Sequence, residues 1–275
     1  MSRPTQFTID LQALCENART LKDLAGPRRT MAVVKADAYG HGAVQCARAL
    51  SPLVDAFAVA ITEEAVALRD AGIDLPILVL QGPHSLEDAQ IMSSAALWPA
   101  ISSEHQIDWL EQTGAQFEQV WLKCDTGMHR LGFTPDETAS ARSRLTALSV
   151  SEIVLMSHFA DAEAPDSALT ERQLLRWGQL SDAAPAGSFS NSAATTGKIA
   201  PNESWVRLGY SLYGGSLVAL PDGYSLKPVM QFESCIASVR WIEVGESVGY
   251  GGRWVARRRS RIATIPVGYG DGYPR

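Results

Sequence analysis

The chain has 275 residues, of which 46 % are apolar and 20 % are charged, as expected for a soluble globular protein with one large domain and a small appendage. The formal net charge of −6 excludes the strongly basic surface of a nucleic-acid-binding protein. Four scattered cysteines without a C-x-x-C pair argue against a disulfide framework or a metal site, and no apolar run has the length of a signal sequence or a membrane span. We therefore expect a cytoplasmic protein with no nucleic-acid, membrane or metal partner.

Short apolar runs alternate with longer amphipathic stretches up to about residue 215. The amphipathic stretches predict helices, for example at 62–71, where Thr62 is a candidate N-cap and Gly72 a candidate stop. Eight strands that alternate with helices predict parallel βαβ units and a closed TIM-type (β/α)8 barrel; an open doubly wound sheet remains the alternative. The expected strands are residues 31–35, 55–60, 76–80, 95–98, 118–124, 152–157, 187–190 and 204–208.

After about residue 228 the pattern changes to strands without helices. Residues 230–243 and 261–268 have the composition of strands, and glycine-rich turns occupy 249–252 and 268–272. We therefore expect two domains, a barrel at 1–228 and an all-β domain at 229–275. So short a stretch of sheet cannot enclose a core of its own, which predicts that the second domain is incomplete.

Polar side chains follow the ends of several predicted strands, where TIM barrels carry their functional groups. Lys35 ends the first strand and is followed by the small-residue, glycine-punctuated segment 36–42. Partial desolvation there lowers the pKa of an ammonium group and makes it a nucleophile near neutral pH. The alternative is a lysine that merely extends from a strand end into solvent. Other strand-end candidates are Tyr39, Lys123, Arg130, His158, Asn191, Ser192, Arg207, Gly209 and Tyr210.

Eight motifs along the chain, taken in order, resemble those of the alanine racemase family, which comprises fold-type III enzymes that depend on pyridoxal 5′-phosphate (PLP). The resemblance covers essentially the whole chain. The motifs are Ile9-Asp10-Leu11, the lysine segment 32–42, Asp-Thr-Gly-Met-x-Arg-Leu-Gly at 125–132, Ser157-His158-Phe159, Asn191-Ser192, Arg-Leu-Gly-x-x-Leu-Tyr-Gly at 207–214, Val-Gly-Tyr-Gly at 248–251 and Gly-Tyr-Gly-Asp-Gly at 268–272.

The resemblance implies two catalytic bases. Lys35 would bind PLP covalently and would remove the α-proton from the D-enantiomer, and Tyr250 would act on the L-enantiomer. Racemisation needs groups on opposite faces, because one group that returns the proton to the same face makes no enantiomer. The resemblance also implies a homodimer in which Tyr250 is contributed by the partner subunit. The residues alone favour the alternative, a tyrosine packed at a strand–turn corner.

The resemblance further assigns the groups that would hold the cofactor. Arg207 would face the ring nitrogen and, because it stays protonated, could only donate to it. His158 would support Arg207 and Tyr250. The phosphate would lie among Tyr39, Ser192 and the backbone amides of Gly209 and Tyr210, with Asn191 beside them.

Three further residues would serve the substrate. Arg130 would bind its carboxylate, and Tyr269 would lie at the entrance to the site. Lys123 would be carbamylated, as in some family members, and would hold Arg130 in place; an unmodified lysine in an ion pair is the alternative.

The implied function is the interconversion of L- and D-alanine by a PLP-dependent isomerase, for peptidoglycan synthesis or for alanine catabolism. A serine or broad-specificity racemase is one alternative, and a non-catalytic PLP-binding barrel is another, although such barrels lack the β domain. Family members continue beyond the glycine-rich turn at 268–272 and add a Met-Asp pair and a tyrosine at the active site. The resemblance therefore implies a C-terminally truncated member, whose activity the sequence does not decide.

Overall fold

The chain divides into two compact units, one formed by Leu11–Val229 and the other by Met1–Asp10 together with Met230–Arg275. The computed structural model describes residues 4–114, 116–148, 150–181, 186–197, 199 and 201–273. The sequence analysis placed the opening residues in the barrel domain, but they belong to the second unit. Strand β1 (Gln6–Ile9) pairs antiparallel with β10 (Met230–Glu233), and the ring of Phe7 stacks on that of Phe232 with centroids 4.3 Å apart. The first strand therefore belongs with the C-terminal unit.

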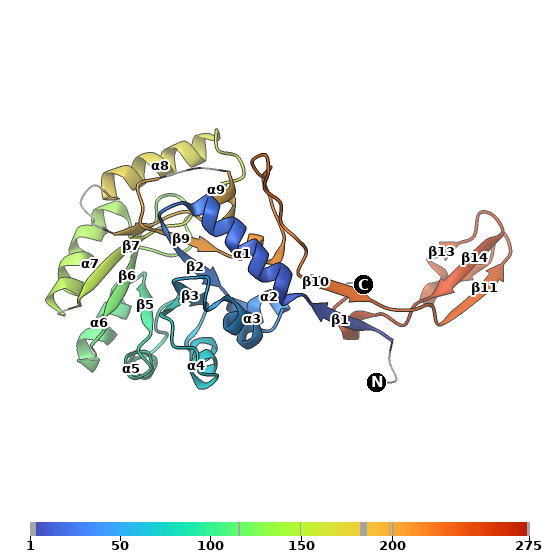
Figure 1. Cartoon of the computed structure of the whole chain (residues 1–275), viewed down its shortest axis with the longest axis horizontal. Coiled ribbons are helices and arrows are strands. Elements are labelled where there is room, and N and C mark those ends of the chain that lie inside the picture. Colours follow the sequence, from blue (N-terminus) through green and yellow to red (C-terminus); the bar gives the residue numbers. More distant parts are fainter. Residues whose placement is uncertain are drawn as a thin grey trace. The chain divides into compact units, whose positions relative to one another are not determined.

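Eight parallel strands of the larger unit close into a barrel, which confirms the predicted TIM-type fold and excludes the open sheet (Figure 1). Closure follows from the pairing of the last strand with the first, in which Thr30 is opposite Val206. The strands are β2 (Arg29–Val33), β3 (Ala56–Val59), β4 (Ile77–Val79), β5 (Trp98–Ile101), β6 (Gln119–Lys123), β7 (Glu152–Met156), β8 (Gly187–Ser188) and β9 (Trp205–Leu208).

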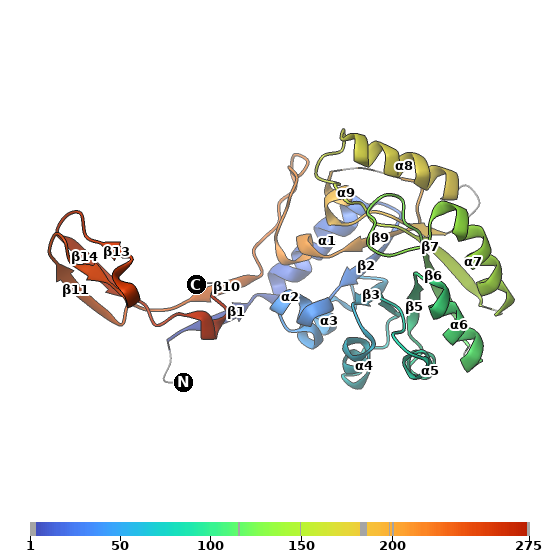
Figure 2. The ribbon, with the colours of Figure 1, turned by 180° about the vertical axis from the view of Figure 1, so that it is seen from behind.

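Helices surround the barrel, as the view from behind shows (Figure 2). The longer helices bury one face; in α1, for instance, Leu14, Ala18 and Leu21 recur at helical spacing and are buried. The helices are α1 (Leu11–Ala25), α3 (Ala43–Leu50), α4 (Thr62–Asp70), α5 (Leu86–Ser94), α6 (Glu104–Thr113), α7 (Pro135–Ala147), α8 (Ala168–Ser181) and the short α9 (Ser192–Thr196). Among the described residues no helix is long and apolar enough to cross a membrane.

Two local predictions were wrong. The fourth strand begins at Trp98 rather than at residue 95, because α5 continues to Ser94 and Ala96 has a positive φ of 49°, so the chain is still turning there. Thr62 is not an N-cap: Ile61 takes that position, and the buried hydroxyl of Thr62 has no hydrogen-bond partner. The carboxylate of Glu64 in the first turn of α4 reaches back to the segment that precedes the helix and accepts a hydrogen bond from the N–H of Ala60.

The barrel interior is filled by a layer of three tryptophans. The rings of Trp98, Trp121 and Trp205 pack against one another with centroids 5.7 to 6.3 Å apart. Side chains two residues apart on a strand point to the same side, so Trp121 and Trp205 are followed on their strands by Lys123 and Arg207. A packed apolar layer therefore underlies the polar side chains at the C-terminal ends of the strands.

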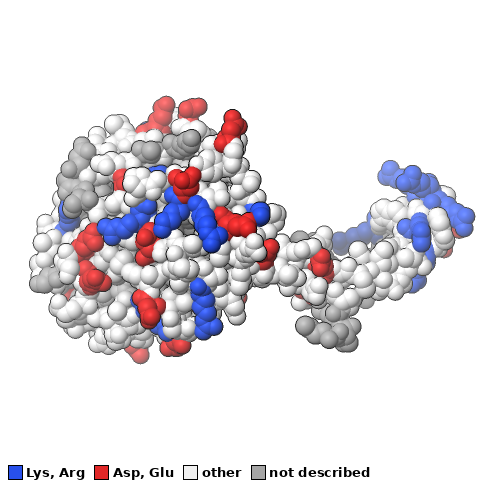
Figure 3. All heavy atoms as spheres, viewed as in Figure 1, with Lys and Arg blue, Asp and Glu red and all other residues white. Residues whose placement is uncertain are grey.

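The C-terminal unit is built of strands and short turns, as the sequence predicted. Strand β11 (Ser238–Ile242) pairs antiparallel with β14 (Ser260–Thr264), and β12 (Ser247–Val248) pairs with β13 (Trp254–Val255). Residues 234–237 interrupt the expected strand at 230–243. Basic side chains gather on this unit (Figure 3), where the exposed run Arg257–Arg259 precedes β14.

Candidate active site

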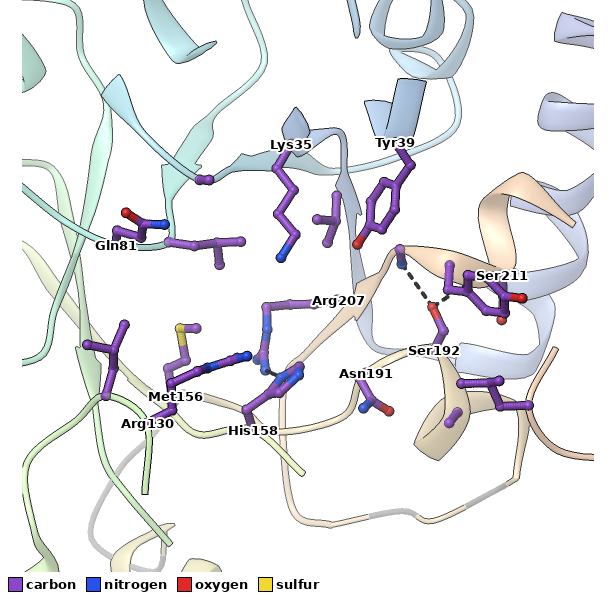
Figure 4. A pocket seen from close by; sticks show the side chains of 18 of the residues that line it. Lys35, Tyr39, Gln81, Arg130, Met156, His158, Asn191, Ser192, Arg207 and Ser211 are labelled. Atoms are coloured by element: carbon purple, nitrogen blue, oxygen red, sulfur yellow. Dashed lines mark hydrogen bonds between the residues drawn. The ribbon is translucent and has the colours of Figure 1, made fainter. Parts of the chain in front are cut away.

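A cavity of about 370 Å³ opens among the C-terminal ends of the barrel strands (Figure 4). Its lining brings together all ten barrel residues that the sequence singled out: Lys35, Tyr39, Lys123, Arg130, His158, Asn191, Ser192, Arg207, Gly209 and Tyr210. Tyr250 and Tyr269 belong to the other unit, where their side chains are 97 % and 83 % exposed. The sequence analysis missed Gln81 and Glu163, two further polar residues of the lining.

Lys35 opens a left-handed turn, α2 (Lys35–Gly40). The four residues after it, Ala36 to Tyr39, all have φ between 51° and 55°, a conformation that costs a residue with a side chain roughly 1–2 kcal/mol. Asp37 stabilises the turn: its carbonyl accepts the N–H of Gly42 at 2.9 Å and its carboxylate that of Ala43 at 2.7 Å. One turn of helix returns Tyr39 to the side of Lys35, and both side chains point into the cavity (Figure 4).

Close packing holds Tyr39 in this position. Its ring contacts that of Tyr213 with centroids 5.0 Å apart, and the hydroxyl of Tyr213 donates to the carbonyl of Val33 at 3.0 Å. A Cβ atom at Gly209 would lie 2.8 Å from the Tyr39 hydroxyl, so only glycine fits there without moving the tyrosine. Burial raises the pKa of Tyr39, which keeps the phenol protonated and able to donate.

The hydroxyl of Ser192 lies against the backbone that follows β9. It accepts hydrogen bonds from the N–H of Gly209 at 2.9 Å and of Ser211 at 3.4 Å (Figure 4). Gly209 and Tyr210, whose backbone amides the sequence analysis assigned to a phosphate, both line the cavity beside Ser192. Asn191 caps α9, with its side-chain oxygen accepting the N–H of Ala194 at 3.0 Å. Hydroxyl and amide donors thus converge on one side of the cavity, an arrangement suited to an anion.

Arg207 is almost fully buried and fixed by several hydrogen bonds. Its guanidinium donates to the hydroxyl of Ser188, to the carbonyl of Ser157 at 2.6 Å and to Nδ1 of His158 at 3.1 Å. Because arginine can only donate, Nδ1 of His158 accepts and the imidazole proton lies on Nε2. Burial, then the positive charge of Arg207, lower the pKa of His158 well below its usual value. Burial also lowers the pKa of Arg207 to about 10, which leaves it charged near neutral pH.

Lys123 ends β6 and is only 7 % exposed. Burial lowers its pKa to about 8, with smaller contributions from Arg207, Arg130 and Lys35. Among the residues that the structure describes, no carboxylate forms a salt bridge with Lys123, although the charge of Asp125 acts in the opposite direction and raises its pKa slightly. The described lining thus contains four cationic side chains and a single acid, Glu163, and favours an anionic ligand.

The loop after β6 presents Arg130 to the cavity. The carboxylate of Asp125 accepts the N–H groups of Gly127 and His129, and lies 3.0 Å from the imidazole Nδ1 of His129. A Cβ atom at Gly132 would lie 2.9 Å from the backbone nitrogen of Asp125, so glycine is needed to close the loop. The loop is thus tied together around Arg130, whose own side chain stays exposed at the cavity.

Two family models match the chain over almost its whole length. The model of the alanine racemase N-terminal domain matches residues 9–217, and that of the alanine racemase C-terminal domain matches residues 229–275. The chain belongs to the alanine racemase family. This confirms the family predicted from the motifs and identifies the chain as an isomerase.

Individual alanine racemases agree in sequence and structure. The chain is 43 % identical to the alanine racemase of Alteromonas mediterranea over 278 aligned residues. The alignment covers all of this chain and 78 % of that protein. The catabolic alanine racemase of Pseudomonas aeruginosa is also 43 % identical, over 99 % of this chain and 78 % of its own. The crystal structure of the biosynthetic alanine racemase of Pseudomonas aeruginosa superposes with a TM-score of 0.93 at 39 % identity, over 99 % and 78 % of the two chains.

Proposed function

We propose that this enzyme interconverts L- and D-alanine with PLP bound covalently to Lys35. The observation that carries the proposal is the convergence of Lys35, Tyr39, Ser192 and Arg207 on one cation-lined cavity. Each supplies a group that PLP requires: an amine for its aldehyde, hydroxyl donors for its phosphate and a cation for its ring. Gly209, where a Cβ atom would displace the Tyr39 hydroxyl, would let the backbone approach the phosphate closely.

When bound, PLP supplies the electron sink that stabilises negative charge on the substrate Cα. The protein sets the strength of that sink through Arg207. Its guanidinium is held by Ser157 and Ser188 and remains protonated, so it would only donate to the ring nitrogen and would leave that nitrogen without a proton. A weaker sink favours rapid return of the proton to Cα over transamination or elimination.

Two bases would exchange the α-proton from opposite faces. Nζ of Lys35 takes the proton from the D-enantiomer or returns it, and the phenol oxygen of Tyr250 does so for the L-enantiomer. The almost complete exposure of Tyr250 within its own unit supports a role in a neighbouring subunit, and we propose a homodimer that shares this residue. Tyr269, which is also largely exposed, would narrow the entrance.

Arg130 would bind the substrate carboxylate, and Lys123 would hold Arg130 as a carbamate. The lowered pKa of Lys123 supports this step, because a neutral amine is needed to attack CO₂. The ammonium first loses one proton; the neutral amine then forms an N–C bond as one C=O π bond of CO₂ breaks, and a second proton leaves the nitrogen. A cation among three others would thus become an anion. That change turns a repulsive neighbour of Arg130 into an attractive one.

The four cysteines are unpaired, which supports a cytoplasmic location. Biosynthetic and catabolic alanine racemases both match the chain, and we propose no choice between these roles. Interconversion of the enantiomers of alanine, serine and lysine by one PLP-loaded preparation tests the activity. We expect alanine to react fastest. Faster turnover of serine or lysine would indicate a broad-specificity racemase, and full PLP binding without any turnover would indicate a non-catalytic PLP-binding protein.

A further inference from the structure

The carboxylate of Glu64 joins the ends of two neighbouring barrel strands beside Lys35. One oxygen accepts the N–H of Ala60, which follows β3 and lines the cavity, at 2.7 Å. The other accepts the N–H of Ala36, which directly follows Lys35, at 2.6 Å. Both bonds are short, as expected where an ionised oxygen accepts from the backbone.

The N–H of Ala36 belongs to the peptide group between Lys35 and Ala36. Fixing that peptide plane fixes ψ of Lys35 and φ of Ala36, the torsion that begins the left-handed turn. These two angles set the direction of the backbone where it passes from Lys35 into the turn. Since the turn is strained at four successive residues, an external partner is needed to hold its first peptide group.

The link also ties the lysine to the rest of the barrel. Strands β2 and β3 are adjacent, and the N–H of Val34 donates to the carbonyl of Ala58 at 2.8 Å. The β2–β3 ladder ends after Val34. Beyond it, the carboxylate of Glu64 accepts one backbone N–H from the segment after each strand, that of Ala36 after β2 and that of Ala60 after β3. Asp37 holds the far end of the turn and Glu64 holds its start.

From this geometry we propose that Glu64 is a positioning residue, which orients Lys35 by holding the peptide group that follows it. The proposal rests on the proposed role of Lys35 as the cofactor lysine. Glu64 touches neither cofactor nor substrate and acts only through the backbone.

Glu63 provides a matched control. It lies in the same first turn of α4, carries the same charge, is exposed and has no hydrogen bond or ion pair among the described residues. Glu63→Gln therefore removes the same favourable charge from the helix N-terminus without touching Ala36. Glu64→Gln replaces one accepting oxygen with an NH₂ group that cannot accept. Glu64→Asp keeps the charge but is one methylene shorter, so we expect that its carboxylate no longer bridges the N–H groups of Ala60 and Ala36.

The experiment compares the full-length, PLP-loaded wild type with these three variants. For Glu64→Gln and Glu64→Asp we expect kcat to fall at least about tenfold with little change in KM. We also expect the visible circular dichroism of the bound cofactor to weaken and amide exchange at Ala36 to accelerate. Glu63→Gln should match the wild type in all of these. Thermal melting separates positioning from folding, because Glu64→Asp retains the negative charge in the first turn of α4 and should melt close to the wild type.

Unchanged kcat and dichroism in Glu64→Asp, with Ala36 exchanging as in the wild type, would overturn the proposal. So would a loss of kcat in Glu63→Gln as large as that in Glu64→Gln. Recovery of the cofactor from a lysine other than Lys35 in the wild type would instead refute the proposed function. In that case the exchange rate of Ala36 still reports whether Glu64 holds the turn.

Discussion

The two units of the chain differ in how many of their apolar side chains are buried. The barrel encloses Trp121 and Trp205 completely and places Lys123 and Arg207 against them, two residues further along their strands. In the described part of the C-terminal unit, Ala256 is the one apolar residue that is buried, and Trp241 and Tyr250 are exposed. Burial therefore positions the groups assigned to the cofactor, whereas the groups assigned to the second base and the entrance are not held by packing within their own unit.

Backbone strain shows the same contrast. Within the described residues, all six non-glycine positions with positive φ lie in the barrel unit, four of them in the lysine turn. In the C-terminal unit every described position with positive φ is a glycine, such as Gly249 and Gly251. A tightly packed unit can impose an unfavourable conformation on alanine or tyrosine, and a loosely packed one relies on glycine.

Tryptophan truncation should separate the two units most strongly. Trp121→Ala removes a fully buried ring and should lower the free energy of unfolding by about 3–5 kcal/mol. Trp241→Ala removes a ring that is 58 % exposed and stacks on Arg259, and should cost less than about 1 kcal/mol. Urea denaturation measures both. Similar losses would show that the C-terminal unit is packed as tightly as the barrel.

Tyr250→Phe should affect chemistry without affecting stability. We expect α-proton abstraction from L-alanine to fall by at least about a hundredfold and abstraction from D-alanine to fall much less. Exchange of the α-proton with D₂O, followed separately for each enantiomer, measures this. Tyr273→Phe, at an exposed tyrosine of the same unit, is the control. Equal loss from both enantiomers would assign Tyr250 a structural role.

The buried charge of Lys123 should weaken the barrel in a pH-dependent way. Its pKa of about 8 lies below the 10.5 of the unfolded chain, so the unfolded state binds more protons between these values and stability rises with pH across that range. In CO₂-free buffer, Lys123→Met should add up to about 3 kcal/mol near pH 7 and remove this rise, because no ammonium group is then desolvated in the barrel and, to a smaller extent, because Arg207, Arg130 and Lys35 no longer face a fourth cation. Arg258→Met, at an exposed site, should do neither. A variant less stable than the wild type at pH 7 would contradict the account.

Two glycine substitutions should change the free energy of unfolding least, and in opposite directions. Ala36→Gly relieves a positive φ in the lysine turn and should raise the free energy of unfolding by roughly 0.5–1 kcal/mol. Ala67→Gly, at an exposed position in α4, should lower it by about 1 kcal/mol. Chemical denaturation of both variants measures the difference. A loss of stability in both would mean that the turn is not strained at Ala36.

The sequence predicted what depends on local pattern. The eight barrel strands are short apolar runs, so the hydrophobic pattern predicted them. The polar residues that line the cavity come at the ends of these strands, so their position in the sequence predicted the site. The pairing of β1 with β10 joins segments more than 200 residues apart in the chain, and no local pattern indicates it.

The lysine turn was predicted only as a glycine-punctuated loop. Ala36 and Tyr39 have no intrinsic preference for positive φ, so the left-handed turn follows from tertiary contacts, including those of Asp37 and Glu64. Glu64 itself has the sequence context of an ordinary acid in the first turn of a helix. Its bond to Ala36 spans 28 residues and is visible only in the fold.

The central claim is that the left-handed turn presents Lys35 as the cofactor lysine. Reduction of the PLP-loaded protein with borohydride, followed by peptide mapping, tests this most directly. The account predicts that the cofactor is recovered on the peptide that contains Lys35 and that Lys35→Ala abolishes the label. Recovery on Lys123, the other lysine of the cavity lining, would contradict it.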